Sequence, residues 1–333
     1  MRTPVLFITF NRPDHASITF ESIRKARPER LYIASDGPRE DKPGEAELVQ
    51  EVRKIIERVD WPCKVETLFR KRNQGCAIAV SSAITWFFSK EPEGIVLEDD
   101  LLPHEDFFTF CETMLERYRD NPRIGCITGN NFQLGARRGD GAYYYSYLNH
   151  CWGWASWARA WKYYDHSMNQ MRHCTKNILP ALHEDRSTFQ GLITRFEHTL
   201  CGKVNSWAYR WQLAAYVNEM LTVTPNHNLA KNIGFGTGTH CTARCLWENI
   251  QTFPMSNFNA PSTIEADLEA DKLALLLTQT SGGTAPISLL HIASTRLGSP
   301  LACSVPEVLR LFREFYGHTP LADQIEQALD NRQ

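Results

Sequence analysis

Three consecutive acids, Glu98-Asp99-Asp100, form the feature of the sequence with the clearest chemical meaning. They directly follow the apolar run 94–97, so we expect them at the end of a buried strand, where their charges repel one another and lose solvation. A divalent cation relieves both problems, and Mg²⁺ or Mn²⁺ takes oxygen ligands while leaving positions for water and phosphate. The alternative is a solvated acidic turn that caps the next helix. We predict a metal site at this triplet.

Polar groups also follow the three strands that we predict earlier in the chain. Arg12 comes after the first, Asp36 after the second, and Arg72 with Asn73 after the third. In an open parallel sheet, ligands bind beyond the carboxyl ends of the strands, so we expect these groups to meet the acids at one edge. The arginines would bind phosphate, and Asp36 and Asn73 would contact a base or a ribose. The alternatives are surface arginines and ordinary turns.

Two further kinds of candidate lie in the second half of the chain. Lys231, in the Asn- and Gly-rich segment 226–240, would bind phosphate from an ordered loop, or would be a loop residue without a ligand. Trp154 and Trp207 offer flat apolar rings on which a sugar ring would stack. The helical spacing of Trp154, Trp157 and Trp161 favours the alternative, that these rings belong to the core.

Alternating strand and helix patterns must position these groups. We predict strands at 4–10, 31–35, 64–69, 94–97 and 124–128. We predict helices at 13–26, 45–59, 75–88, 106–118, 178–200 and 305–316. Strands that alternate with helices favour βαβ units, right-handed connections and a parallel sheet. The fold class that we expect is therefore α/β.

The composition excludes several classes of protein. A chain of 333 residues, 43% of them hydrophobic, can bury a full α/β core. Its net charge of −2 gives no general attraction to nucleic acid. No apolar stretch approaches the roughly 20 residues that span a bilayer, and the first apolar run is too short for a signal peptide. We expect a cytoplasmic protein without a membrane anchor, whose scattered cysteines are reduced, buried thiols.

Several motifs occur in a fixed order along the chain. They are Phe10-Asn11-Arg12-Pro13, Ser35-Asp36-Gly37, Asn73-Gln74-Gly75-Cys76, Leu97-Glu98-Asp99-Asp100, Trp152-Gly153-Trp154-Ala155-Ser156-Trp157 and Asn232-Ile233-Gly234-Phe235-Gly236. In this order, over roughly residues 3–245, the chain resembles bacterial GT-A glycosyltransferases of the N-acetylglucosaminyltransferase I-like family. The ordered set is specific for the family and much less so for the substrate.

The resemblance implies a GT-A fold and an inverting transfer from a UDP-sugar, with a GlcNAc-like donor favoured, to a hydroxyl of a glycan or glycoconjugate. It implies Mn²⁺ or Mg²⁺ as cofactor, bound by Asp100, with His240 as a later residue that reaches the metal or the diphosphate. The residues that it assigns to the donor are Glu98 and Asp99 at the donor sugar and ribose, Asp36 at the uracil, and Arg12. Of these residues, Glu98 is the one that we predict to be catalytic.

The sequence departs from the family pattern at the general base. The expected Trp-Asp-x-x-Trp is replaced here by Trp-Ala-Tyr-Arg-Trp, with Ala208 at the second position, and alanine cannot accept a proton. Asp165 or Glu219 would have to supply the base, or the chain has been altered, or it is a natural relative without catalysis. A donor-binding, inactive protein is therefore one alternative function. A sugar nucleotidyltransferase is another, although residues 11–13 are not the Gly-rich, basic loop of such enzymes.

We expect one GT-A domain over residues 1–260. Its nucleotide-sugar-binding half spans 1–130 and its acceptor-facing half spans 131–260. A mostly helical C-terminal extension follows over 261–333. The expected partners are a UDP-sugar donor and a glycan or glycoconjugate acceptor, and a lipid-linked acceptor would bring the protein to a membrane surface.

Overall fold

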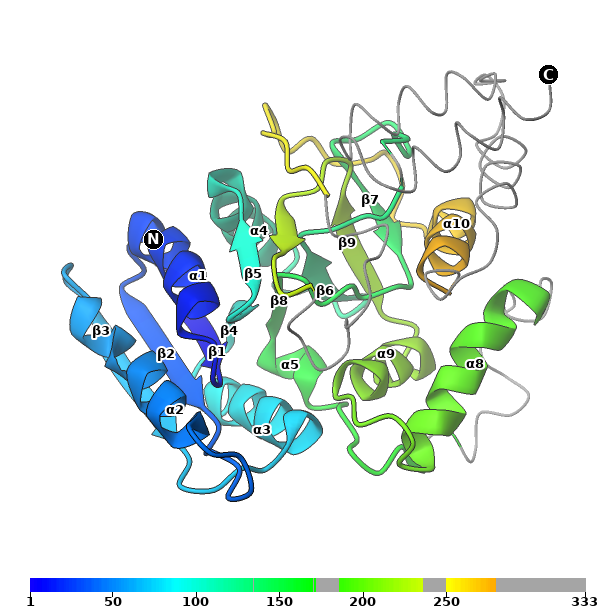
Figure 1. The fold of residues 1–333 in the computed structure, drawn as a ribbon. Helices are drawn as coiled ribbons and strands as arrows, with labels where there is room; N and C mark the ends of the chain where they lie inside the picture. Colours follow the sequence, from blue (N-terminus) through cyan, green and yellow to red (C-terminus); the bar gives the residue numbers. More distant parts are fainter. Residues whose placement is uncertain (134, 170, 172–185, 236–249, 280–333) are drawn as a thin grey trace, which may run out of the picture.

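The chain has a mixed α/β fold built on one central sheet (Figure 1). The computed structural model describes residues 1–133, 135–169, 171, 186–235 and 250–279. Eight strands form the sheet in the order β3-β2-β1-β4-β8-β6-β9-β7. This architecture confirms the predicted α/β class.

The first half of the chain forms parallel βαβ units, as the sequence predicts. Its strands are β1 (Val5–Thr9), β2 (Arg30–Ser35), β3 (Lys64–Phe69) and β4 (Glu93–Glu98). β2 and β4 flank β1, and β3 lies outside β2, all in parallel. All five residues of β1 are buried because helices cover both faces of this central strand. The chain reverses its direction of winding between β1 and β4, which makes that edge the expected place for a ligand.

The helices that connect these strands lie on opposite faces of the sheet. They are α1 (Pro13–Ala26), α2 (Glu45–Arg53), α3 (Cys76–Phe88) and α4 (Glu105–Arg117). Side chains of α1, α2 and α4 share one hydrophobic cluster, and those of α3 belong to the cluster on the other face. The predicted helix over 45–59 is wrong in its second half, where a 3-10 helix, η1 (Lys54–Arg58), replaces the α-helix.

The second half of the chain extends the same sheet. Its strands are β6 (Ile124–Thr128), β7 (Tyr143–Ser146), β8 (Trp154–Trp157) and β9 (Leu221–Pro225). β8 runs antiparallel to both of its neighbours, β4 and β6, so it joins the two halves by hydrogen bonds. A small antiparallel ribbon of β5 (Leu101–Pro103) and β10 (Ala230–Asn232) lies beside this junction. Residues 1–130 and 131–260 thus share one sheet.

Four more helices complete the described fold. They are α5 (Ala158–Trp161), α8 (Arg186–Leu200), α9 (Ala208–Val217) and α10 (Leu268–Gln279). α10 belongs to the predicted C-terminal extension and is anchored on β7, because its buried Asp271 accepts hydrogen bonds from Ser146 Oγ and Tyr147 N. Positions 178–185 of one predicted helix, and the predicted helix over 305–316, lie outside the described residues. Within the described ranges, no helix has the length and apolarity needed to cross a bilayer.

Candidate functional site

Arg12 and the acid triplet meet where the first and fourth strands end. Arg12 directly precedes α1, and its Nη2 donates to Asp99 Oδ1 at 2.5 Å and to Asp100 Oδ2 at 3.1 Å. The side chain of Asp99 is 4% exposed, while those of Asp100 and Arg12 are 18% and 23% exposed. Asp99 is therefore a buried partner of Arg12, and Asp100 is the acid of this pair that solvent or a ligand can reach.

Asp99 holds the loop after β4 against the end of β1. Its Oδ2 accepts from the backbone N–H of Phe10 at 2.9 Å, and its backbone carbonyl accepts from Thr19 Oγ1 of α1. A carboxylate with these partners is fixed in place and has little capacity left for a ligand. The prediction that Asp99 contacts a ribose stays a prediction, and its structural role is to orient the triplet.

The site carries more buried negative charge than its single arginine balances. Burial, together with the neighbouring charges of Asp100 and Asp99, raises the pKa of Glu98 to about 8. Burial also raises the pKa of Asp99 to about 6, although the Arg12 guanidinium opposes the change. Among the described residues, no hydrogen bond reaches the Glu98 carboxylate. A second positive charge would stabilise the ionised acids.

The residues present fit a divalent cation whose remaining ligands come from substrate and water. Asp100 Oδ2 is used by Arg12, which leaves Asp100 Oδ1 and the Glu98 carboxylate as oxygen donors. No cluster of three or more His, Cys, Asp or Glu residues suited to a metal occurs in the described part of the chain. Mg²⁺ and Mn²⁺ are commonly held in this way, by one or two carboxylates together with phosphate oxygens. Asp100 thus remains the predicted metal ligand.

Gly234 closes the site from the side of the β5–β10 ribbon. The Ile233 N–H donates to the Asp100 carbonyl at 2.7 Å, which draws the residues after β10 over the triplet. A Cβ atom at Gly234 would lie 2.5 Å from Asp100 Oδ2 and 2.7 Å from Arg12 Nη1. Since real Cβ atoms do not approach so closely, only glycine fits here without moving Asp100 or Arg12. Arg12 Nη1 is itself buried and has no hydrogen-bond partner among the described residues.

Asp36 organises the loop that follows β3. Its carboxylate accepts hydrogen bonds from the backbone N–H groups of Gly37, Gln74 and Gly75 and from Asn73 Nδ2, at 2.9–3.2 Å. These bonds support the interpretation of Asp36 and Asn73 as turn residues. A contact of either residue with a base or ribose stays a prediction, because it would compete with bonds that already occupy both carboxylate oxygens.

Cys76 connects the Asp36 loop with the acid triplet. This partly buried residue opens α3, directly after Gly75. Burial, together with the charges of Glu98, Asp100 and Asp36, raises the pKa of its thiol to about 12. Because one thiol senses all three carboxylates, the ends of β2 and β4 surround a common point of the sheet edge. This agrees with the predicted convergence of the strand ends.

The tryptophan predictions require correction. Trp154 and Trp207 stack on each other with ring centroids 5.7 Å apart, and they are 1% and 3% exposed. Neither ring has a face available to a sugar, so the prediction that they stack on the substrate is wrong and the core interpretation is confirmed. The helical spacing is also misleading, since Trp154 and Trp157 lie in a strand, β8. The two ring systems are buried because β8 packs against α9.

Ala208 begins α9 near the loop that Asp36 organises. A Cβ at Gly75 would lie 3.4 Å from Asn205 Nδ2, so the chain just before α9 approaches the site. The two substitutes for the missing base gain no support. Glu219 is exposed beyond the far end of α9, about 15 Å along the helix from Ala208. Asp165 is engaged in its own turn, where it accepts from the backbone of residues 167 and 169.

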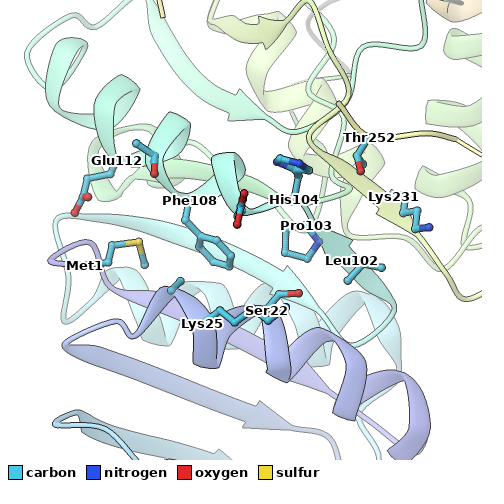
Figure 2. Close-up of a pocket in the computed structure, with 13 residues that line it drawn as sticks. Met1, Ser22, Lys25, Leu102, Pro103, His104, Phe108, Glu112, Lys231 and Thr252 are labelled. Carbon is cyan, nitrogen blue, oxygen red and sulfur yellow. The ribbon is translucent and has the colours of Figure 1, made fainter. Parts of the chain in front are cut away.

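Two other predicted residues, Arg72 and Lys231, form no hydrogen bond or ion pair with the acids among the described residues. The guanidinium of Arg72 is 82% exposed and lies 3.6 Å from Glu40, so the surface interpretation of this arginine is confirmed. Lys231 lines a groove of about 590 Å³ between α1 and α4, together with Leu102 and Phe108 (Figure 2). Its contact with a phosphate stays a prediction. His240 lies outside the described residues.

The sequence alone does not reveal two features of the site. Gly234 belongs to a recognisable motif, but the close approach that requires glycine depends on the pairing of β5 with β10, which no local pattern indicates. The second feature is a group of partly exposed aromatic rings around Trp152. Within a strand, residues two apart lie on the same face, so Trp152 would be expected to be buried like Trp154. Trp152 precedes β8, however, and this rule does not apply to it.

Comparisons with known proteins add little to this description. No model of a known protein family matches the chain, and no curated protein matches it. One solved structure that resembles it is apo-UDP-glucose pyrophosphorylase, with a TM-score of 0.33 and 9% sequence identity, over 69% of this chain and 93% of that chain. A likeness at this level carries no argument about activity.

Proposed function

We propose that the chain is a metal-dependent glycosyltransferase that binds a UDP-sugar at the ends of β1 and β4. The observation that carries the proposal is the junction of Arg12, Asp99 and Asp100 at the point where the sheet reverses its winding. An arginine beside partly exposed acids suits a diphosphate together with its divalent cation. A GlcNAc-like donor and an inverting reaction are the finer parts of the proposal and follow from the family resemblance.

Each residue of the junction has a distinct task in this proposal. Asp100 and Glu98 would hold the cation, which when bound would neutralise negative charge on the nucleoside diphosphate. Arg12 keeps Asp100 oriented, and its Nη1, which has no partner in the described part of the chain, would donate to a phosphate oxygen. Gly234 lets the backbone after β10 pack closely on Asp100 and Arg12, which keeps both side chains in place. The hydroxyl of a glycan or glycoconjugate would then attack the anomeric carbon.

Binding of the donor without turnover is a second candidate, and Ala208 favours it. An inverting transferase needs a group that accepts the proton of the attacking hydroxyl. The side chain of Ala208, at the start of α9, cannot do so, and neither Glu219 nor Asp165 gains support as a replacement. The two candidates share the donor site and differ only in catalysis.

A thermal-shift panel tests the shared part of both candidates. UDP-GlcNAc, UDP-glucose, UDP-galactose and GDP-mannose are each added with and without Mn²⁺, since a ligand that binds the native state stabilises it by mass action. We expect stabilisation by a UDP-sugar that requires Mn²⁺, that disappears in Asp100→Ala and that persists in the control Asp120→Ala, an exposed acid after α4. Equal stabilisation without metal would contradict the role of Asp100. Release of pyrophosphate from UTP and a sugar phosphate would favour a nucleotidyltransferase instead.

A further inference from the structure

Four aromatic side chains form a partly exposed group next to the acid triplet. Phe132 contacts His150 and Trp152 with ring centroids 4.5 and 5.1 Å apart, and Trp152 contacts Phe235 at 5.7 Å. All three contacts are edge-to-face, with interplanar angles of 70–78°. Phe132 is buried, whereas the other three rings retain exposed surface. We call these four residues the aromatic cluster.

Hydrogen bonds hold the three segments of the cluster in fixed positions. The Gly129 N–H donates to the Gly153 carbonyl at 2.8 Å, which ties the loop after β6 to the start of β8. Asn130 Nδ2 donates to the Ala230 carbonyl at 2.5 Å and ties the same loop to β10. Thr128 Oγ1 donates to the His150 carbonyl at 2.6 Å. A surface with these supports is already ordered before a ligand arrives, which reduces the entropy lost on binding.

The cluster borders the acid triplet from two directions. Phe235 directly follows Gly234, whose missing Cβ would touch Asp100. Cys151 lies between His150 and Trp152, and its thiol is within electrostatic reach of Glu98. The rings of the cluster therefore adjoin Gly234, which contacts Asp100, and Cys151, which is close to Glu98. Asp100 and Glu98 are the two acids proposed to hold the cation.

Partly exposed rings at this place suit one type of ligand. The C–H face of a pyranose is apolar and packs against a flat aromatic surface, while its hydroxyl groups stay in water or bond to polar groups. In a UDP-sugar the pyranose is joined directly to the phosphate that a cation at Asp100 would hold. The sugar ring must consequently lie close to that cation, and the cluster reaches this region through Phe235, the residue after Gly234.

We propose that Trp152, supported by Phe132 and Phe235, forms the surface on which the pyranose ring of the donor packs. This inference rests on the proposed function, since it assumes a nucleoside diphosphate at Asp100. The rings of Trp154 and Trp207 are buried, so neither can have this role. Trp152 belongs to the same sequence motif as Trp154, and its ring is partly exposed. Trp152 is a specificity-determining residue in this account, because it contacts the sugar and not the nucleotide.

Comparing UDP with UDP-sugars separates the sugar contact from the nucleotide contact. Dissociation constants for UDP and for the UDP-sugar that the wild type binds best are measured by calorimetry with Mn²⁺. We expect Trp152→Ala to weaken binding of the UDP-sugar about tenfold and to change the binding of UDP less than twofold. Trp152→Phe, which keeps an aromatic face, should restore most of the affinity. Trp86→Ala, a partly exposed tryptophan of α3 that packs against Tyr32, should leave both constants unchanged.

The outcomes distinguish this inference from the proposed function. If Trp152→Ala weakens UDP and the UDP-sugar equally, or weakens neither, the inference is wrong while a metal-dependent nucleotide site stands. If the wild type binds neither ligand in a way that requires Mn²⁺, the proposed function fails and this inference fails with it. Circular dichroism of each variant shows whether a loss of affinity reflects unfolding.

Discussion

Replacing Gly234 by alanine should separate the geometry of the site from the stability of the fold. The new Cβ would lie 2.5 Å from Asp100 Oδ2, 2.8 Å from Asp100 Cβ and 2.7 Å from Arg12 Nη1. The backbone at Gly234 does not adopt a left-handed conformation, so alanine meets a steric conflict and no strain in φ. Overpacking of this kind costs about 1–3 kcal/mol, and relief requires Asp100 or Arg12 to move.

The expected result is a loss of metal-dependent nucleotide binding that exceeds the loss of stability. A shift of Asp100 by a few tenths of an ångström matters because Mg²⁺ and Mn²⁺ tolerate little deviation in their ligand positions. We expect the affinity for UDP in the presence of Mn²⁺ to fall at least about tenfold, which corresponds to about 1.4 kcal/mol. Calorimetric titration with UDP measures the affinity, and urea unfolding measures the stability.

Gly44→Ala provides the matched control. Gly44 has φ +80°, and a Cβ atom there would have no neighbouring atom within 4 Å, so alanine costs about 1–2 kcal/mol of backbone strain without touching the site. The control should lose comparable stability and keep its affinity for UDP. If Gly234→Ala bound UDP with Mn²⁺ as the wild type does, or if both variants lost affinity equally, Gly234 would not be needed to position Asp100 and Arg12.

Three further predictions follow from the same structure. Ala208→Asp should raise the rate of UDP release from a UDP-sugar and an acceptor by about 10²-fold or more, because it supplies a base at the start of α9; unchanged turnover with intact donor binding would count against a catalytic role for this position. Asp36→Ala should lower the free energy of unfolding by about 2 kcal/mol or more in urea, since four donors lose their acceptor, and Asp36→Asn, which keeps one oxygen, should lose less. Burial raises the pKa of Asp271 from 3.8 to about 7, so its protonated form is favoured in the folded state. The stability that the protonated carboxyl provides, roughly 4 kcal/mol, is present below about pH 4 and is lost as the pH rises to about 7. Asp271→Asn should therefore flatten the dependence of the free energy of unfolding on pH. Curves of this free energy against pH that run parallel for the wild type and the variant would contradict the prediction.

The parallel half of the fold could be predicted because its signals are local. Continuous apolar runs bounded by turn residues locate β1, β2 and β4, and the rule that ligands bind at the carboxyl ends of strands then brings Arg12 to the acids. The junction of Arg12 with Asp99 and Asp100 agrees with that prediction. Such an inference needs only the order of elements along the chain.

The parts that failed depend on contacts between distant segments. Trp154 and Trp157 have a spacing that fits a helix, yet β8 forms because it fills the space between β4 and β6. Whether a tryptophan is buried or accessible depends on what α9 covers, so the sequence could not separate Trp152 from Trp154. The place of Gly234 likewise depends on the β5–β10 pairing, which joins residues more than a hundred positions apart.

The most direct test of the central claim is a crystal structure with UDP and Mn²⁺, in which anomalous scattering locates the metal. We expect a manganese peak about 2.0–2.3 Å from a carboxylate oxygen of Asp100, with the diphosphate bound to the same ion and an Arg12 nitrogen bonded to a phosphate oxygen. A diphosphate bound elsewhere, or bound at Arg12 with no manganese near Asp100, would contradict it.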